Sequence, residues 1–450
     1  MNGKRTGRIA HNTTRVLALG FAAVILLGAL LLTLPAASVT GESVGFSDAL
    51  FTSTSAVCVT GLVVRDTGTE YTLFGQIVII LLIQIGGLGL MTVATLFFML
   101  LGKRITLGER LISQESMNED RIGGLVRLMR WVAFSAFTIE LCGAAVLATR
   151  LIPDFGFARG LYYSIFHSIS AFCNAGFDLF GNYSSLTAYV NDPVINFTIM
   201  LLIIIGGLGF GVLEDLWRNR GFRRLRLHSK IVLWATGIAI AFGTLFTLAV
   251  EWSNPATIGP LNGFQKVMAS MFQSVTLRTA GFNSIDQAAL HPATKLISIV
   301  LMFIGACPAS TGGGIKLTTL AVLIFTVRMV ARGRSEICVF KRTIPRSLVQ
   351  QATTVVFIGI AVLLVDVVVL TLLEPGVDFL DNAFECASAL GTVGLSSIGS
   401  ANLLPLARYF IIFTMFIGRV GPLTLTLAIA RRQASSKDVI RYPEDRVLVG

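Results

Sequence analysis

Long apolar runs alternate with short polar segments along the whole chain. A membrane-spanning helix needs about 20 mostly apolar residues, and eight runs are close to or above that length. The pattern therefore predicts an all-α polytopic membrane protein with eight transmembrane helices. The predicted spans are Val16–Leu34, Gln76–Leu101, Trp131–Ile152, Pro193–Leu213, Ile231–Val250, Leu296–Val330, Ala352–Leu373 and Arg408–Ala430.

A shorter amphipathic segment that ends in glycine recurs four times, once between the members of each pair of spans. About 12 residues precede each glycine, roughly 18 Å of helix, which is too short to cross a bilayer. The glycines lie 115, 105 and 113 residues apart. This repeat predicts four units, each a span, a re-entrant half-helix, a glycine turn and a span, in a pseudo-fourfold arrangement around a central ion pathway. The segments are Phe46–Leu62, Leu161–Phe177, Gln265–Phe282 and Leu380–Leu395.

Basic residues gather in five blocks, which fall between the units and at both ends of the chain. These blocks hold 27 of the 36 Lys and Arg residues. A re-entrant segment returns the chain to the side it came from, so both spans of a unit have their far ends on one side. The positive-inside tendency places that side, with both termini, in the cytoplasm. The blocks are 1–15, 102–130, 218–230, 328–346 and 431–450.

Composition argues against several classes of function, namely nucleic-acid binding, metal ribbons and redox pairs. The net charge of +11 could indicate nucleic acid, but 54% of the residues are hydrophobic, only 14% are charged, and no soluble domain is left to bind it. The six cysteines form no CxxC pair, which argues against metal ribbons and redox pairs. The chain is predicted to divide into pore unit 1 (1–101), pore unit 2 with a cytoplasmic linker (102–217), pore unit 3 with a mid-membrane loop at 305–316 (218–334), pore unit 4 (335–432) and a C-terminal tail (433–450).

The repeated glycines have a chemical interpretation. Non-helical backbone is tolerated at membrane depth only where it is shielded or lines water, so four such turns could build one ring. The sequence Thr392-Val393-Gly394 matches the first three letters of the TVGYG potassium filter, whose carbonyls replace the ion's hydration shell. Glycine permits the required backbone angles. Helix packing is the alternative reading of any one such glycine, but four at matched spacing favour a filter.

These four units and their loops resemble the Trk/Ktr/HKT superfamily of potassium transporters over essentially the whole chain. With eight core spans, the chain is most similar to the bacterial Ktr-type membrane subunit, because Trk subunits carry an extra pair. Serine replaces the first filter glycine in sodium-selective plant relatives, so Gly61 implies potassium. The implied selectivity-filter residues are Val59, Thr60, Gly61, Asn174, Ala175, Gly176, Thr279, Ala280, Gly281, Thr392, Val393 and Gly394.

The second spans of units three and four depart from a common pattern. A glycine recurs in every second span, and units one and two continue alike as Gly-Gly-Leu-Gly. Unit three instead contains proline and a triple glycine, which cannot sustain a regular helix, so its long span should break around a loop. The resemblance implies that this is the family's intramembrane gating loop. The recurring glycines are Gly86, Gly206, Gly305 and Gly418.

Unit four has an arginine in the middle of its apolar run. A mid-membrane arginine costs at least about 2.5–3.5 kcal/mol, so Arg419 should face the cavity or a partner. A fixed positive charge beneath a cation filter raises an electrostatic barrier, which makes Arg419 part of the expected gate. The expected gate residues are Gly305, Pro308, Gly312, Gly313, Gly314, Lys316 and Arg419.

The resemblance also implies a function and partners. The expected activity is potassium uptake across the bacterial cytoplasmic (plasma) membrane, with K⁺ as the transported ion and no cofactor or other metal on this chain. The expected assembly is a homodimer on a separate cytoplasmic ring subunit that binds ATP or ADP. Activation by Na⁺, and whether flux is channel-like or coupled, stay open, as does a role for the tail.

Two alternatives remain. One is a sodium-permeable or poorly selective transporter of the same fold. The other is an integral-membrane enzyme built around Thr311–Lys316, but that run lacks the GxxxxGK[ST] spacing and no strand precedes it. The four histidines form no HExxH motif, and no Ser/His/Asp constellation can be placed. The chain is therefore predicted not to be an enzyme and not to bind nucleic acid.

Overall fold

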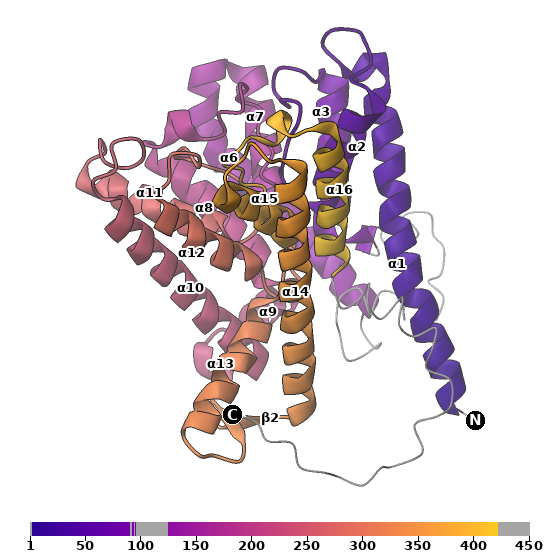
Figure 1. The fold of residues 1–450 in the computed structure, drawn as a ribbon, viewed down its shortest axis with the longest axis vertical. Helices are drawn as coiled ribbons and strands as arrows, with labels where there is room; N and C mark the ends of the chain where they lie inside the picture. The colour runs from indigo at the N-terminus through magenta and orange to yellow at the C-terminus, as the bar shows by residue number, and fades with distance from the viewer. Residues whose placement is uncertain (1, 91, 94, 96–124, 422–450) are drawn as a thin grey trace.

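The computed structural model describes residues 2–90, 92, 93, 95 and 125–421. Helices make up nearly all regular structure in this part of the chain, which confirms the predicted all-α class (Figure 1). Most of the predicted linker 102–130 and the whole predicted tail 433–450 lie outside the described residues.

The first helix of each unit is long and apolar enough to cross a membrane. These helices begin several residues before the predicted spans, because helical backbone continues into the polar, basic flanks. In α6, for example, the helix starts six residues before the apolar run at Trp131. The four helices are α1 (Asn2–Thr33), α6 (Leu125–Phe155), α10 (Leu227–Glu251) and α14 (Arg346–Leu373).

The four repeat segments form short helices, as predicted. They contain 13 to 16 residues, too few to span a bilayer. Local sequence fixes two of their starts: Asn262 and Gln265 form a reciprocal capping box, and the Asp378 carboxylate accepts from the Leu380 N–H. The helices are α2 (Phe46–Cys58), α7 (Phe157–Phe172), α11 (Gly263–Thr276) and α15 (Phe379–Gly391).

Three of the second helices end at a glycine inside the predicted span, and the last residues of the predicted spans Gln76–Leu101 and Arg408–Ala430 lie outside the described residues. The second helices of units one, two and four end at a glycine with a φ of 85° to 93°, a conformation that side chains disfavour. After Gly209 the chain turns by 96° into α9 (Phe210–Asn219), so the continuous span Pro193–Leu213 is wrong. Hydropathy missed the break because apolar residues continue across it. The second helices are α3 (Leu73–Leu88), α8 (Pro193–Leu208), α12 (Pro292–Phe303) and α16 (Pro405–Val420).

Unit three breaks as the sequence predicts. Residues 304–316 are not helical, and α13 (Leu317–Ala331) continues the chain. A small antiparallel hairpin of β1 (Ile337–Val339) and β2 (Arg342–Ile344) follows and leads into α14. Buried Ile337 and Ile344 pack with apolar side chains of α9, α10 and α13, so the hairpin belongs to the body of the protein.

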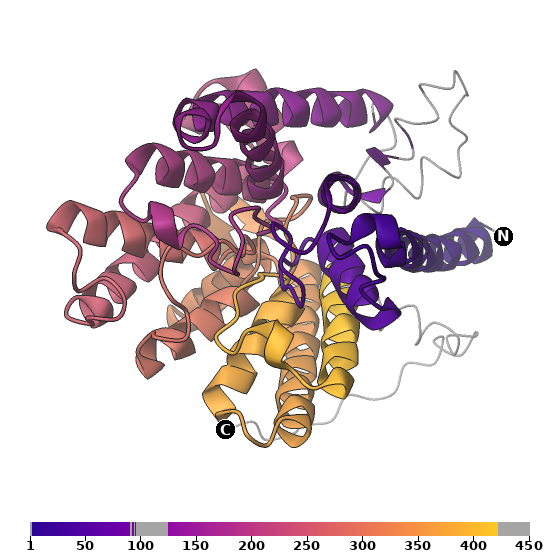
Figure 2. The same ribbon diagram turned by 90° about the horizontal axis from the view of Figure 1, so that it is seen from above.

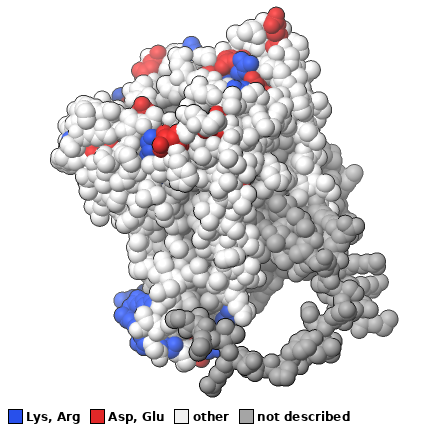
Figure 3. Space-filling view, in the orientation of Figure 1, with Lys and Arg blue, Asp and Glu red and all other residues white. Residues whose placement is uncertain are grey.

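The units follow one another around a common centre (Figure 2). Each second helix packs against the short helix of the next unit: α3 on α7, α8 on α11, α12 on α15, and α16 on α2. The last contact returns to the first unit and closes the ring. The two ends of the molecule differ in charge: acidic side chains gather at the upper end in Figure 3, and a cluster of basic ones at the lower end.

Candidate functional site

The four glycines that end the repeat segments form a closed ring of backbone contacts. A Cβ added to Gly176 would lie 2.7 Å from the Ala280 carbonyl oxygen, and one on Gly281 would lie 2.6 Å from that of Val393. In the same way, a Cβ added to Gly61 would overlap the Ala175 carbonyl oxygen, and one on Gly394 would overlap that of Thr60. Each glycine thus abuts the backbone of the next unit, and only glycine fits at these four positions.

The backbone conformation is the same in all four loops. The residue two positions before each glycine has a left-handed φ, between 51° and 68°, although none of these four residues is glycine. The glycines themselves have φ between 70° and 96°. Such strain persists only where surrounding structure imposes it. The left-handed residues are Val59, Asn174, Thr279 and Thr392.

A hydroxyl in each short helix holds its loop, a feature not predicted from the sequence. The Gly61 N–H donates to Ser55 Oγ at 3.0 Å, and the Gly394 N–H donates to Ser388 Oγ at 3.0 Å. Ser170 and Thr276 instead donate to the carbonyls that follow their glycines. The signal was available, since Ser55, Ser170 and Ser388 each stand six residues before the loop glycine, and Thr276 is displaced by one.

A cavity of about 380 Å³ opens above the ring. All four loop glycines line it, together with the acidic residues Asp66, Asp178 and Asp286. Burial raises the pKa of Asp178 to about 7, and the nearby Asp66 carboxylate adds to the rise. The cavity combines carboxylates with the four glycine loops, so it is suited to concentrate cations at one mouth of the ring.

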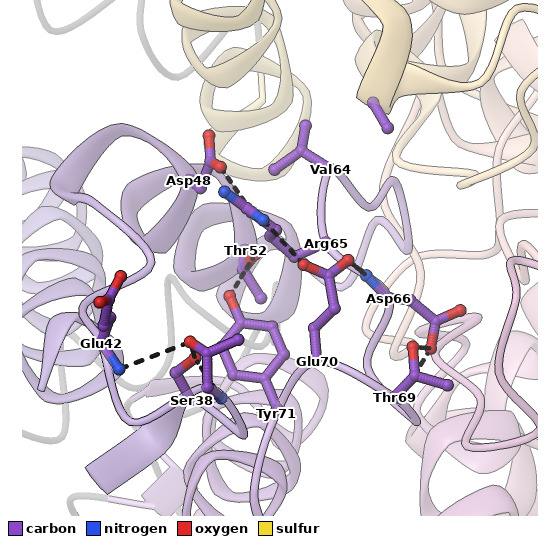
Figure 4. A network of polar contacts seen from close by, with 12 residues as sticks. Ser38, Glu42, Asp48, Thr52, Val64, Arg65, Asp66, Thr69, Glu70 and Tyr71 are labelled. Atoms are coloured by element: carbon purple, nitrogen blue, oxygen red, sulfur yellow. Dashed lines mark hydrogen bonds and ion pairs between the residues drawn. The ribbon is translucent and has the colours of Figure 1, made fainter. Parts of the chain in front are cut away.

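Polar contacts at the acidic end join residues within unit one and link this unit to units two and four. Arg65, which follows the first loop, donates to Asp48 at 2.7 Å and to Glu70 at 2.8 Å (Figure 4). Asp48, in the first turn of α2, also accepts from Arg408 of unit four at 3.0 Å. The Asp66 carboxylate accepts from the Tyr183 N–H at 2.7 Å, which joins unit one to unit two.

The remaining neighbours are joined in the same layer. The Leu186 N–H of unit two donates to the Asn283 carbonyl of unit three at 3.0 Å. Lys295 of unit three and Asp381 of unit four form an ion pair of 2.6 Å, with side chains only 10% and 24% exposed. All four neighbouring pairs of units are therefore linked around the cavity.

The loop of unit three is anchored on the broken helix of unit two. The N–H groups of Cys307 and Thr311 donate to the carbonyls of Gly207 and Gly206, at 3.1 and 3.3 Å. The Phe210 N–H donates back to the Ala309 carbonyl at 2.9 Å. The end of a helix leaves such backbone groups free to make other bonds. The break at Gly209 therefore supplies the partners that this loop uses.

The triple glycine lies directly against the third and fourth glycine loops. The Gly313 N–H donates to Thr392 Oγ1 at 3.1 Å, and a Cβ on Gly312 would overlap Thr279 Oγ1. The half-buried Lys316 ammonium donates to the carbonyls of Gly312 and Gly313 at 2.9 and 3.3 Å, and so holds the turn.

Arg419 lies against the same loop from the opposite helix. Its guanidinium donates to the Thr311 carbonyl at 2.6 Å and to the Gly86 carbonyl of unit one. Gly86, Gly206 and Gly418 each abut a carbonyl near the end of their own unit's short helix, whereas Gly305 abuts Gly313 of the loop. The residues predicted to form a gate therefore lie close together around the loop 305–316. Pro308 belongs to this group, because its carbonyl oxygen lies against Gly209.

One further charged residue escaped the sequence analysis. Arg278 stands just before the third loop and is only 5% exposed. Its guanidinium donates to the Cys307 sulfur at 3.9 Å, so it joins the third glycine loop to the loop 305–316. The available signal was a charge three residues before the loop glycine, where the other three segments have Cys58, Cys173 and Gly391.

The chain is similar to known proteins in both sequence and fold. The family model TrkH, described as "Cation transport protein", matches residues 7–439. The chain is 44% identical to Ktr system potassium uptake protein B of Bacillus subtilis, over 97% of this chain and 96% of that protein. It is 37% identical to the potassium/sodium uptake protein NtpJ of Enterococcus hirae, over 99% of each. The crystal structure of the potassium transporter TrkH from Vibrio parahaemolyticus superimposes with a TM-score of 0.72 at 17% identity, covering 94% of this chain and 85% of that one, which shows a shared fold.

Proposed function

Because the chain belongs to the TrkH family of cation transport proteins, we propose that it takes up potassium ions through the ring of four glycine loops. Membership of the family confirms the resemblance inferred from the repeats, and it excludes the integral-membrane enzyme. The observation that carries the proposal is the closed ring itself, in which each loop glycine abuts a carbonyl of the next unit.

The selectivity filter in this proposal is the set of three residues in each loop, ending at Gly61, Gly176, Gly281 and Gly394. Carbonyl oxygens from four sides replace the hydration shell of potassium without a ring of carboxylates. The common left-handed backbone supports equivalent coordination from every unit, because similar φ values orient the carbonyls alike. The pore units retain the proposed limits 1–101, 102–217, 218–334 and 335–432, and each contributes one loop.

The gate in this proposal is the loop 305–316 together with Arg419. Lys316 and Arg419 place two cationic groups on a loop that lies against Thr279 and Thr392 of the filter. Positive charge beside the path of a cation raises the barrier to its passage. Movement of the loop requires its bonds to Gly206 and Gly207 to break, so opening depends on the second helix of unit two.

The acidic end faces outward in this proposal, and the basic end faces the cytoplasm of a bacterium, with both termini on that side. The relatives named for potassium uptake support the direction of transport. We also propose a homodimer on a separate cytoplasmic ring subunit that binds ATP or ADP. Its docking surface is the basic end of the molecule (Figure 3).

A second candidate is a transporter that also admits sodium. Its support is the similarity to NtpJ, a protein whose name includes both potassium and sodium. Gly61 argues for the potassium-selective form, since the first loop has the same glycine geometry as the other three.

Growth rescue tests the proposed function. A bacterium that lacks its own potassium uptake systems should grow on low-potassium medium when it carries this chain, and better when a cytoplasmic partner is added. Membrane fractionation in the same cells establishes that the chain is present. Normal membrane levels without rescue, both with and without the partner, would contradict the proposal.

A further inference from the structure

A second cavity, of about 300 Å³, lies at the basic end and has no part in the ion pathway described above. It is formed by the end of α13, the β1–β2 hairpin and one side chain of α10. Its polar wall contains three arginines, Arg328, Arg332 and Arg334, and its apolar wall contains Trp234 and Phe325.

The arginines are available to bind an anion. All three are exposed, and within the described part of the chain none of them forms an ion pair. Glu336 is the one acidic residue that lines the cavity. A guanidinium presents donors in a planar fork that matches the oxygens of a phosphate group. The polar wall therefore fits a phosphate.

The apolar wall indicates which kind of molecule would contain that phosphate. Trp234 is 49% exposed and stacks on Phe325, with ring centroids 6.3 Å apart. On the same helix as Phe325, the side chains of Ile324, Val327 and Val330 are also exposed. Tryptophan is enriched where a membrane protein meets the headgroup layer, and exposed aliphatic side chains beside it indicate contact with acyl chains.

The hairpin gives this cavity a fixed wall. Its two-residue turn, Phe340-Lys341, has positive φ at both positions, the geometry of a tight hairpin turn but without glycine. The Phe340 ring also contacts Phe222 edge-on, with centroids 6.1 Å apart. Surrounding contacts thus hold a strained turn in place, as expected of a built site rather than a free loop.

We propose that this cavity binds the phosphate headgroup of an anionic phospholipid from the leaflet at the basic end. Basic pockets between transmembrane helices on the cytoplasmic side are suited to such headgroups. An acidic protein segment would satisfy the arginines but would leave the aliphatic face of α13 without a partner. The inference rests on the chain's place in a membrane and does not require potassium selectivity.

Quenching of Trp234 fluorescence tests this site in the full-length protein. Trp131, Trp217 and Trp252 are replaced by Phe, which leaves one fluorescent tryptophan in the cavity. The protein is reconstituted in phosphatidylcholine vesicles that contain either brominated phosphatidylglycerol or brominated phosphatidylcholine. The anionic lipid should quench with an apparent affinity at least about fivefold higher. Equal quenching by the two lipids would overturn the proposal.

Two further arms separate a lipid site from other causes. Excess inorganic phosphate should leave the quenching unchanged, and its reversal would indicate a free-phosphate site instead. Replacement of Arg328, Arg332 and Arg334 by Gln should abolish the preference for the anionic lipid. The matched control replaces three exposed arginines at the same end, Arg220, Arg223 and Arg224, by Gln and should keep it.

An equal loss of preference in both triple variants would show only general attraction to the charged end, and it would refute the site. Potassium flux is measured separately on the same vesicles. Failure of the lipid site therefore leaves the proposed transport function untouched, and failure of transport leaves the lipid site testable.

Discussion

The Arg419 guanidinium donates a hydrogen bond of 2.6 Å to the backbone carbonyl of Thr311, 108 residues earlier in the chain. This bond joins the second helix of unit four to the intramembrane loop of unit three. The same guanidinium reaches the Gly86 carbonyl of unit one. One side chain thus connects three of the four units on the side of the second helices.

Removal of this side chain should open the pathway. Arg419→Ala loses both the fixed charge and the bond to the loop, so potassium flux into proteoliposomes should rise by about tenfold, equivalent to ~1.4 kcal/mol of barrier. Arg224→Ala, which removes an exposed charge at the basic end, should leave flux unchanged. A chain that lacks residues 312–314 should behave like Arg419→Ala. Unchanged or lower flux in both the Arg419 and the loop variants would refute the gate.

The selectivity for potassium over sodium should depend on the backbone conformation at Gly61. Gly61→Ser places a Cβ on the Ala175 carbonyl at a φ of 93°, which strains the loop by about 1–3 kcal/mol. The ratio of potassium to sodium permeability should fall by at least about fivefold, which corresponds to ~1 kcal/mol. Ion-gradient flux assays with each cation measure this ratio.

Gly45→Ser is the matched control for that substitution. Gly45 has a similar φ of 84°, but nothing lies within 4 Å of an added Cβ. The control carries the same backbone strain without contact with the ring, so selectivity should be kept. Equal ratios in Gly61→Ser and the parent chain would show that this glycine does not shape the filter.

The links between units at the acidic end should contribute to stability. Lys295→Met leaves the Asp381 carboxylate without its 2.6 Å partner in a largely buried position, which should cost about 1–3 kcal/mol. The melting temperature of the purified protein should therefore fall. Arg218→Met breaks an exposed pair with Glu214 and should cost about 0.5 kcal/mol or less. Similar melting temperatures for the two variants would refute the prediction.

Uptake should change near neutral pH because of Asp178. Its pKa is raised from 3.8 to about 7, so the carboxyl holds its proton below pH 7 and is ionised above it. The negative charge that appears in the cavity above the ring should increase uptake as the pH rises through 7. Between pH 3.8 and 7 the Asp178 carboxyl binds a proton in the folded protein but not in the unfolded chain. The contribution of Asp178 to the free energy of unfolding therefore falls as the pH rises through that window.

Two variants isolate this effect. Asp178→Asn should remove the rise in uptake near pH 7 and hold uptake at its low-pH level. Asp286→Asn removes another carboxylate from the same cavity and should keep the rise. A rise that survives in Asp178→Asn would assign the titration to a different group.

The parts of this site that could be predicted are those marked by a sequence motif that recurs along the chain. The four loop glycines were found because the same amphipathic segment precedes each one at nearly equal spacing. The breaks at Gly89, Gly209 and Gly421 were missed because apolar residues continue across them, and hydropathy does not report φ. The sequence does contain a glycine three residues after each of Gly86, Gly206 and Gly418.

Contacts between units lay beyond sequence reasoning for a different reason. The bond from Arg419 to Thr311 and the pair Lys295–Asp381 depend on which faces of two helices meet. Periodicity fixes the face of one helix but not the rotation of its neighbour. Arg419 could be expected to face the cavity because its burial is costly, yet nothing in the sequence identified its carbonyl partner.

Anomalous diffraction from crystals grown in rubidium tests the central claim most directly, because rubidium replaces potassium and its position is visible. The claim predicts a rubidium peak on the axis of the ring, bounded by the carbonyl oxygens of Thr60, Ala175, Ala280 and Val393. Excess potassium should abolish the peak, and an equal concentration of sodium should not. A rubidium peak at any other place, or none on the axis, would contradict a filter built from the four glycine loops.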